Sequence, residues 1–186
     1  MPKKPGKNTV RSKQPKMLPV HITYLEMLSP ILVMPPVPTR PTVALITANN
    51  IPPSFYTYMY ELIGKAHHWE ERRHMEADRL GKIINNPDCE ISILYVEGCP
   101  GGFFELNLKK RPDAVEIQYV GLAPEYQGLG LGKWFFATAI SAAWRHKPER
   151  VTLETNTLDH PAALPLYQIL GFSPVAIADK QVSEWK

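Results

Sequence analysis

The 186-residue sequence contains two cysteines, and their placement gives neither of them a common structural role. Cys89 and Cys99 form no CxxC pair and have no histidine nearby at the spacing of zinc ligands, so neither a disulfide framework nor a metal site is predicted. The sequence also lacks an apolar run long enough to cross a membrane, and its basic N-terminus leads into proline-interrupted sequence where a signal peptide would be apolar. These absences predict a soluble, cytoplasmic protein.

Acidic side chains are missing from the first seventeen residues, which carry six of the 21 lysines and arginines. All 18 acidic residues therefore lie in the rest of the chain, which is slightly acidic although the whole chain has a formal charge of +3. Such a surface does not match the negative phosphate backbone of nucleic acids, so no nucleic-acid partner is expected.

Residues 1–18 are rich in proline, lysine, serine and asparagine and have almost no apolar side chains. A segment of this composition cannot bury enough apolar surface to offset the entropy lost on ordering, so we predict a disordered basic tail. Contact of this tail with an acidic partner is the alternative. The remaining residues, 19–186, are enough for one domain with a sizeable core but too few for two, so a single domain is predicted.

The first half of this domain alternates strands and helices that are separated by proline-rich segments. Residues 20–28 alternate apolar and polar side chains and predict a strand, and 43–47 predict a second, shorter one. Between them, five prolines in 30–41 exclude a helix or a central strand and indicate an extended connector. Apolar residues at helical spacing then predict helices over 55–65 and 67–85.

The second half begins with three predicted strands and continues with helices. The strands cover 91–98, 102–110 and 114–123, joined by turns at Cys-Pro-Gly-Gly and Lys-Arg-Pro-Asp, which is the pattern of an antiparallel meander. A meander followed by alternating helices and strands predicts a mixed α+β sheet covered by helices. The later elements are expected at 129–146 (helix), 150–155 (strand), 160–171 (helix) and the last residues (short strand).

A glycine-rich segment, residues 127–132 (QGLGLG), connects the last meander strand to the following helix. Glycines let backbone N–H groups turn toward a ligand, and the start of a helix adds partial positive charge, so this loop is suited to a pyrophosphate. The dinucleotide motif GxGxxG would need a glycine where Lys133 stands, and a Walker A loop would need serine or threonine where Trp134 stands. Neither nucleotide motif therefore fits.

Two motifs in this half resemble those of the GNAT acyltransferases. The pattern Gln127-x-x-Gly130-x-Gly132 is similar to the family's Q/R-x-x-G-x-G/A signature, and residues 160–172 (HPAALPLYQILGF) resemble its A-x-x-L-Y-x-x-x-G-F helix and exit turn. The resemblance covers about 92–175 well and 1–50 loosely. Residues 23–27 and 158–164 also resemble a bacterial subgroup of the family.

The resemblance implies a fold and an activity. The implied GNAT fold is a twisted, mostly antiparallel sheet of six to seven strands with about four helices, splayed between its fourth and fifth strands. The implied function is an N-acetyltransferase that moves an acetyl group from acetyl-CoA, without a metal, to a primary amine of a small molecule or a protein, by direct attack within a ternary complex. A monomer or a homodimer is expected, and the alternative function is a non-catalytic acyl-CoA-binding module.

The resemblance also implies the position of the CoA site, in the wedge between the splayed strands. Backbone groups of Val120 and Leu122 would pair with the pantetheine amides, and Gly121 is the expected bulge residue between them because it tolerates unusual backbone angles. The residues expected to contact acetyl-CoA are Val120, Leu122, Gln127, Gly128, Leu129, Gly130, Leu131, Gly132, Lys133, Asn156 and Tyr167.

Three side chains are candidates for catalysis. The family's tyrosine protonates the departing thiolate, which implies this role for Tyr167, with a buried structural tyrosine as the alternative. An attacking ammonium must also lose a proton, and Glu116 or Glu105 is the expected base. Glu116 lies two and four residues before Gln118 and Val120, hence on their face of the strand if no bulge intervenes. Both glutamates have a surface carboxylate as the alternative.

The resemblance also implies an acceptor pocket at the first two helices and the loop between them, and its candidate residues are Tyr58, Trp69 and His160. Aromatic residues at helical spacing can equally belong to a core, and a histidine in this context can belong to a loop. Asp159 is interpreted as the N-cap of the last helix. The identity of the acceptor does not follow from the sequence.

Overall fold

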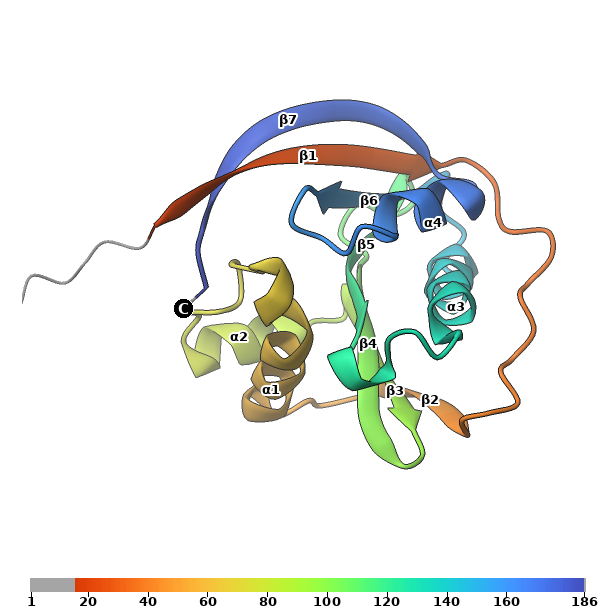
Figure 1. Cartoon of the computed structure of the whole chain (residues 1–186), viewed down its shortest axis with the longest axis horizontal. Coiled ribbons are helices and arrows are strands. Elements are labelled where there is room, and N and C mark those ends of the chain that lie inside the picture. Colours follow the sequence, from red (N-terminus) through yellow and green to blue (C-terminus); the bar gives the residue numbers. More distant parts are fainter. Residues whose placement is uncertain (1–15, 186) are drawn as a thin grey trace, which may run out of the picture.

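A computed structural model describes residues 16–185, which form one seven-stranded mixed sheet with helices on both faces (Figure 1). The predicted tail lies mostly outside the described residues, and its last two, Met17 and Leu18, belong to the first strand. The elements are β1 (Met17–Met27), β2 (Val43–Ala48), α1 (Pro53–Gly64), η1 (Lys65–His67), α2 (Ala77–Ile84), β3 (Cys89–Val96), β4 (Cys99–Asn107), β5 (Ala114–Leu122), η2 (Pro124–Tyr126), α3 (Leu131–Arg145), β6 (Arg150–Asn156), α4 (Ala163–Ile169) and β7 (Ser173–Ser183).

The strands are arranged in the order β2-β3-β4-β5-β6-β1-β7, and all neighbours are antiparallel except β5 and β6. These two pair in parallel only between Ala114–Glu116 and Arg150–Thr152, and their remaining residues have no partner across the gap. The expected mixed sheet of six to seven strands with about four helices is therefore confirmed, with seven strands and the four helices α1–α4 in the described chain. In the labels of Figure 1, the splay lies between β5 and β6.

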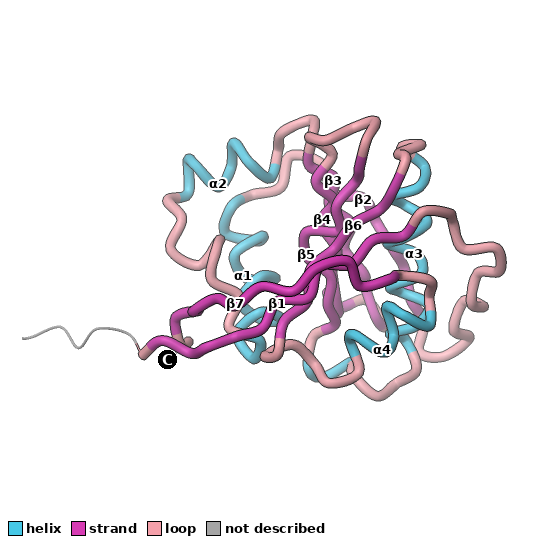
Figure 2. Tube along the Cα trace, turned by 90° about the horizontal axis from the view of Figure 1, so that it is seen from above, coloured by secondary structure: helices cyan, strands magenta, loops and turns pink. Residues whose placement is uncertain are grey.

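Two hydrophobic clusters hold the helices against the sheet. Helices α1 and α2 cover one face, and α3 and α4 cover the other (Figure 2). Ala137, Ala139, Ala142 and Ala143 of α3 are completely buried, so their small side chains let this helix lie close to the strands. Full burial of Phe135 contributes about 1.5–3 kcal/mol to the α3 layer.

Strand β5 contains a β-bulge at Gln118, whereas the bulge was expected at Gly121. Ile117 pairs with Leu106 and Tyr119 with Glu105, so Gln118 is the extra residue between them. The bulge reverses the faces of the strand, because Ile117 packs on the α3 side and Tyr119 on the α1 side. An uninterrupted strand would place Glu116 and Val120 on the same face, as was predicted. Because of the bulge, they lie on opposite faces.

Gly121 has a packing role instead of a bulge. A Cβ atom at this position would lie 2.4 Å from Cγ2 of Ile63, so only glycine lets the end of α1 approach β5 this closely. This close approach brings the C-terminal end of α1 beside the gap between β5 and β6. The expectation that Gly121 sets the backbone angle of a bulge was wrong. The position requires glycine because of its close packing against Ile63.

The second predicted helix is much shorter than 67–85, because only Ala77–Ile84 is α-helical. His68 has a left-handed φ of 54°, which ends the short 3-10 helix η1, and the N–H of Trp69 then donates to the Gly64 carbonyl at 3.1 Å. The Trp69 ring occupies the space beside Gly64, where a Cβ would lie 2.6 Å from its Cε3. Residues 68–76 are therefore a loop folded back on α1.

Two other boundaries differ from the sequence prediction. The turn between β3 and β4 is at Glu97 and Gly98, with φ of 50° and 85°, and the Cys-Pro-Gly-Gly segment belongs to β4. Glycine there serves close packing, since a Cβ at Gly101 would lie 2.7 Å from Val96 and 2.9 Å from Tyr126. The final strand, predicted to be short, has 11 residues and pairs with β1 along its length.

Candidate functional site

A cavity of about 490 Å³ lies where β5 and β6 separate. Side chains from both faces of the sheet line it. On one face are the glycine loop, α3 and α4, including Phe136 and Tyr167, and on the other are Ile63, His67 and Trp69 from the end of α1 and the loop after it. The cavity therefore passes through the opening in the sheet, and a molecule on each face can reach the same point between the strands.

Most of the expected CoA contacts lie together at this cavity. Two do not line it: Leu131 is completely buried in the α3 core, and Leu129 is an exposed side chain of the loop. The expected residues that line the cavity are Val120, Leu122, Gln127, Gly128, Gly130, Gly132, Lys133, Asn156 and Tyr167.

The glycine loop has the backbone of an anion-binding turn. Gly128 and Gly130 have φ of 74° and 76°, angles that side chains rarely adopt, and Gly130 is the N-cap of α3. The Gln127 side chain donates through Nε2 to the Leu122 carbonyl at 3.2 Å, which ties the loop to the end of β5. No acidic residue lies in the first turn of α3, and Lys133 adds a positive charge there. This arrangement favours a phosphate group at the start of the helix.

Tyr167 projects from α4 into the cavity and stacks on Phe136, with ring centroids 4.4 Å apart. Burial raises the pKa of its phenol, and the negative charge of Asp159 raises it further, so the hydroxyl stays protonated at neutral pH. Within residues 16–185, no side chain or backbone group forms a hydrogen bond with this hydroxyl. Its proton is therefore free to be donated to a molecule in the cavity.

The turn after β6 forms the cavity wall between Asn156 and His160. Asp159 accepts hydrogen bonds from the Thr155 hydroxyl at 2.7 Å and the Asn156 N–H at 2.9 Å, so it stabilises this turn. Asp159 was expected to be the N-cap of the last helix. That expectation was wrong, because α4 begins only at Ala163. His160 lines the cavity, and its Nδ1 accepts the N–H of Ala162 at 3.1 Å.

His67, the last residue of η1, and Trp69 of the loop 68–76 form part of the opposite wall. His67 Nδ1 donates to the Leu158 carbonyl at 3.1 Å, which connects the end of η1 to the turn after β6. Trp69 lines the cavity, with its ring centroid 4.9 Å from that of Tyr119. The chain after β7 adds further contacts: the Trp185 N–H donates to His68 Nδ1 at 2.8 Å.

Tyr58 was expected at the acceptor pocket together with Trp69, but the structure separates them. The Tyr58 side chain is 52% exposed and does not line the cavity. Helical spacing alone could not show this, because Tyr56 and Tyr60 occupy the buried face of α1 on either side of it. The neighbours of Tyr58 are thus in the core, and Tyr58 itself faces away.

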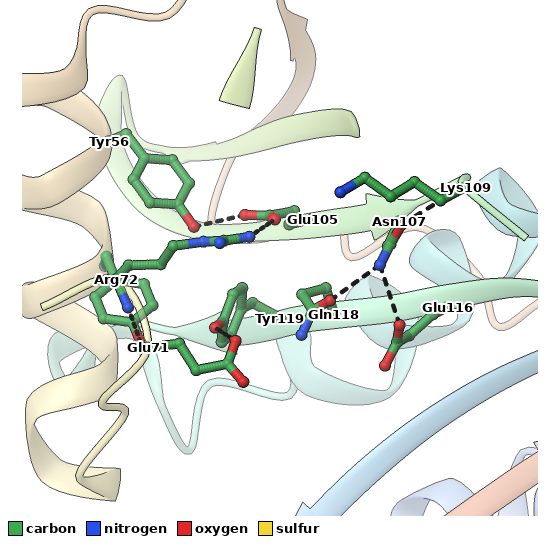
Figure 3. A network of polar contacts seen from close by, with 10 residues as sticks. Tyr56, Glu71, Arg72, Glu105, Asn107, Lys109, Glu116, Gln118 and Tyr119 are labelled. Atoms are coloured by element: carbon green, nitrogen blue, oxygen red, sulfur yellow. Dashed lines mark hydrogen bonds and ion pairs between the residues drawn. The ribbon is translucent and has the colours of Figure 1, made fainter. Parts of the chain in front are cut away.

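Glu105 is 2% exposed and belongs to a buried ion pair on the α1 side of the sheet (Figure 3). One carboxylate oxygen accepts Arg72 Nη2 at 2.8 Å, and the other accepts the Tyr56 hydroxyl at 2.5 Å. Burial and the Glu105 charge raise the pKa of Tyr56, so the phenol remains a donor. Glu105 does not line the cavity between β5 and β6, and both of its oxygens are engaged.

Glu116 also lies outside the lining of this cavity, on the α1 side of the bulge. Asn107 Nδ2 donates to Glu116 Oε2 at 3.2 Å and to Gln118 Oε1 at 3.3 Å (Figure 3). Burial raises the pKa of Glu116, and the nearby Lys110 and the Asn107 hydrogen bond oppose that shift. Of this group, only Gln118 lines the cavity itself.

Glu154, which the sequence interpretation did not single out, is the glutamate that lines the cavity. Although Glu154 is an exposed residue of β6, partial loss of solvent around its carboxylate raises its pKa. The charges of Glu116, Glu71 and Asp159 add to the shift, while Lys180 opposes it. Strand alternation could have identified it, because Glu154 lies two residues before Asn156 and therefore on the same face of β6.

The described part of the chain offers neither a metal site nor a membrane span. No group of three or more histidine, cysteine, aspartate or glutamate side chains in residues 16–185 is placed to hold a metal ion. No helix in the same range has the length and apolar content needed to span a bilayer. Cys89 and Cys99 are both free thiols.

Comparison with known sequences identifies a family. Residues 56–172 match the sequence model of the acetyltransferase (GNAT) family. A protein of Bacillus subtilis (strain 168), named as a candidate ribosomal protein bS18-alanine N-acetyltransferase, is 26% identical over 96 residues, which are 52% of this chain and 62% of that protein. The chain therefore spans about three fifths of the length of this curated relative.

Solved structures of the same fold were also found. A GCN5-related N-acetyltransferase from Kribbella flavida superposes with a TM-score of 0.60 at 18% identity, covering 90% of this chain and 60% of that one. An aminoglycoside acetyltransferase from an uncultured soil sample, in complex with sisomicin, gives 0.56 at 13% identity, covering 69% and 86%. At these identities the likeness concerns the fold.

Proposed function

The chain belongs to the acetyltransferase (GNAT) family, and we propose that it is an acyltransferase that moves an acetyl group from acetyl-CoA to a primary amine within a ternary complex. The observation that carries this proposal is the cavity through the sheet. It joins the anion-binding loop and the protonated Tyr167 on one face to a carboxylate, Glu154, and to the α1 loop on the other. One donor and one acceptor can thus meet between β5 and β6.

The residues fit acetyl-CoA as the donor. The glycine loop and Lys133 offer backbone N–H groups and positive charge to its pyrophosphate. Beyond Glu116, β5 has no partner on the side of β6, so its backbone groups at Val120 and Leu122 can pair with the pantetheine amides in the manner of an added strand. A backbone N–H at this edge can also stabilise the oxyanion that forms on the thioester carbonyl.

The transfer itself requires three proton movements. The attacking ammonium first gives one proton to a carboxylate directly or through water. The neutral amine then attacks the thioester carbonyl, a carbon–nitrogen bond forms, and the carbon–sulfur bond breaks. The departing thiolate takes the phenolic proton of Tyr167, which lines the cavity. The second proton, which the nitrogen loses on becoming an amide, returns through water to the Tyr167 phenolate.

We assign the role of base to Glu154. It lines the cavity, and its raised pKa makes it a stronger base at neutral pH than an ordinary carboxylate. Glu116 remains a second candidate for the base. Its negative charge raises the pKa of Glu154, but Glu116 does not line the cavity and would have to act through water. Glu105 is the least suited of the three, since Arg72 and Tyr56 already occupy its oxygens.

The acceptor class is open to a protein amine or a small molecule. The Bacillus relative is named for an alanine of a ribosomal protein, and the soil structure holds an aminoglycoside, so both classes occur among similar proteins. The alternative function, a non-catalytic acyl-CoA-binding module, does not account for an unengaged, protonated tyrosine opposite a carboxylate in the same cavity.

The proposal is tested by mixing the protein with acetyl-CoA and a panel of primary amines while CoA thiol release is followed. Acetyl-CoA at 100 times its Kd should stabilise the fold by about 2.7 kcal/mol, which corresponds to a rise of roughly 5–10 °C in Tm. The absence of a shift with both acetyl-CoA and CoA would contradict the proposal. A shift without thiol release on any amine would support the binding module instead.

A further inference from the structure

Residues 183–185, at the end of β7 and just beyond it, lie against the loop 68–76 (Figure 1). We propose that this segment positions the acceptor, because it holds the loop where Trp69 forms part of the cavity wall. None of residues 183–185 lines the cavity, so they act through the loop and touch no substrate. This inference rests on the proposed acetyl transfer.

Two backbone groups of the segment hold the residues on either side of Trp69. The Trp185 N–H donates to His68 Nδ1 at 2.8 Å, and the Ser183 N–H donates to Glu70 Oε2 at 3.0 Å. Trp69 stands between His68 and Glu70 in the sequence. A shift of its backbone away from the cavity would therefore strain or break these hydrogen bonds.

Arg73 extends the contact further along the loop. Its Nη1 donates to the Glu184 carbonyl at 3.4 Å, and its guanidinium carbon lies 4.4 Å from the centroid of the Trp185 ring. A cation at this distance is attracted to the negative face of an aromatic ring. The half-buried Trp185 also packs against the hydrophobic cluster that contains Tyr60 and Tyr119, so its ring joins the loop to the α1 side of the core.

The segment can hold the loop because the segment itself is fixed to β1. The Glu184 N–H donates to the Lys16 carbonyl at 2.8 Å, and Lys16 Nζ lies 3.3 Å from the Glu184 carboxylate. Ser183 pairs with Met17 in the ladder between β7 and β1. Strand β1 pairs in turn with β6, whose Glu154 lines the cavity. The segment therefore sets the loop on one wall relative to the strand that carries the proposed base.

The core holds the inner side of the same loop independently. Arg72 forms its buried ion pair with Glu105, and Glu71 accepts the hydroxyl of Tyr119 at 2.9 Å. These contacts do not involve residues 183–185, so they remain when the segment is altered. Loss of the Trp185 ring should therefore loosen the loop without unfolding the domain.

The first test measures the loop without any substrate. Trypsin cleaves after Arg72 and Arg73 when the loop opens, so the cleavage rate reports the population of the open form. In Trp185→Ala, cleavage at these two sites should be about 3–10-fold faster, the size of one partly exposed contact between a cation and a ring. Trp185→Phe keeps a ring over Arg73 and should restore most of the protection. Mass spectrometry of the fragments identifies the sites.

The second test measures transfer to the panel amine that is acetylated fastest. Trp185→Ala should raise KM for this amine about 3–10-fold, while kcat and KM for acetyl-CoA change by less than about twofold. Glu70→Ala removes the acceptor of the Ser183 N–H from an exposed position and should act in the same direction. Trp144→Ala is the matched control, because it removes a half-buried tryptophan whose Nε1 donates to Met27 Sδ at 3.4 Å on the α3 side. It should lower Tm at least as much as Trp185→Ala and leave KM for the amine unchanged.

Failure of this inference is distinguishable from failure of the proposed function. Unchanged trypsin cleavage in Trp185→Ala, or faster cleavage with an unchanged KM for the amine, would overturn the positioning role while acetyl transfer stands. An equal rise of that KM in Trp144→Ala would also overturn it, because the effect would then follow general stability. Transfer to no amine at all would overturn the proposed function and the acceptor role with it, and the cleavage rates would still show whether the segment holds the loop.

Discussion

Replacement of Gly64 by alanine tests whether the loop after α1 shapes the acceptor side of the cavity. The backbone of Gly64 is helical, with φ of −77°, so alanine fits it and should gain about 0.5–1 kcal/mol in helix propensity. The new Cβ, however, would lie 2.6–2.8 Å from three atoms of Trp69, and Trp69 would have to move by several tenths of an ångström at least.

Overpacking of this kind costs about 1–3 kcal/mol. The net effect is a destabilisation of up to about 2 kcal/mol, or a fall of about 2–8 °C in Tm. Because Trp69 lines the cavity, KM for the acceptor should rise about tenfold, while KM for acetyl-CoA, bound on the other face, should change little.

Gly81→Ala is the matched control, since Gly81 is also helical and its new Cβ would meet only Pro53 at 3.4 Å. It should be neutral or slightly stabilising and kinetically normal. Thermal unfolding and initial rates at varied acceptor concentration measure both variants. If Gly64→Ala matches Gly81→Ala in Tm and acceptor KM, the reasoning is refuted.

Three further changes test the assignments at the transfer site. Tyr167→Phe should lower kcat about 100-fold with little change in KM for acetyl-CoA, and an unchanged kcat would remove its role as the acid. Glu154→Gln should lower kcat by a similar factor. In the unchanged protein, kcat/KM should fall as the pH drops through the raised pKa of Glu154, because only the ionised carboxylate accepts a proton. If the variant shows the same fall in kcat/KM at low pH, the titrating group is not Glu154. Gly130→Ala places a side chain at φ of 76°, which costs about 1–2 kcal/mol. The KM for acetyl-CoA should therefore rise, and the increase in Tm caused by CoA should become smaller. If CoA raises the Tm of the variant as much as that of the unchanged protein, the glycine loop does not bind the pyrophosphate.

The sequence predicted the sheet and most of the residues that line the cavity beside the glycine loop, because those features are local. A glycine run that leads into a helix and the Leu166-Tyr167 to Gly171-Phe172 pattern each occupy a few consecutive residues, so their spacing is visible without a fold. The strands were found because their apolar alternation is strong, with boundaries shifted by a few residues.

The acceptor side could not be predicted in the same way, because contacts between distant segments determine it. Nothing near Trp69 in the sequence shows that it folds back onto Gly64, and nothing near Gln118 marks it as a bulge. The bulge changed the face of Glu116, which removed the argument that had made it the leading candidate for the base. The fixed position of Glu105 likewise depends on Arg72, which is 33 residues away.

The passage through the sheet has a consequence for the order in which the substrates add. Acetyl-CoA and the amine would approach the gap between β5 and β6 from opposite faces, so neither blocks the path of the other. Either substrate can then bind first, and CoA and the acetylated product can leave in either order. Such an enzyme has no compulsory sequence of addition, and a high concentration of one substrate does not trap it in an unproductive complex.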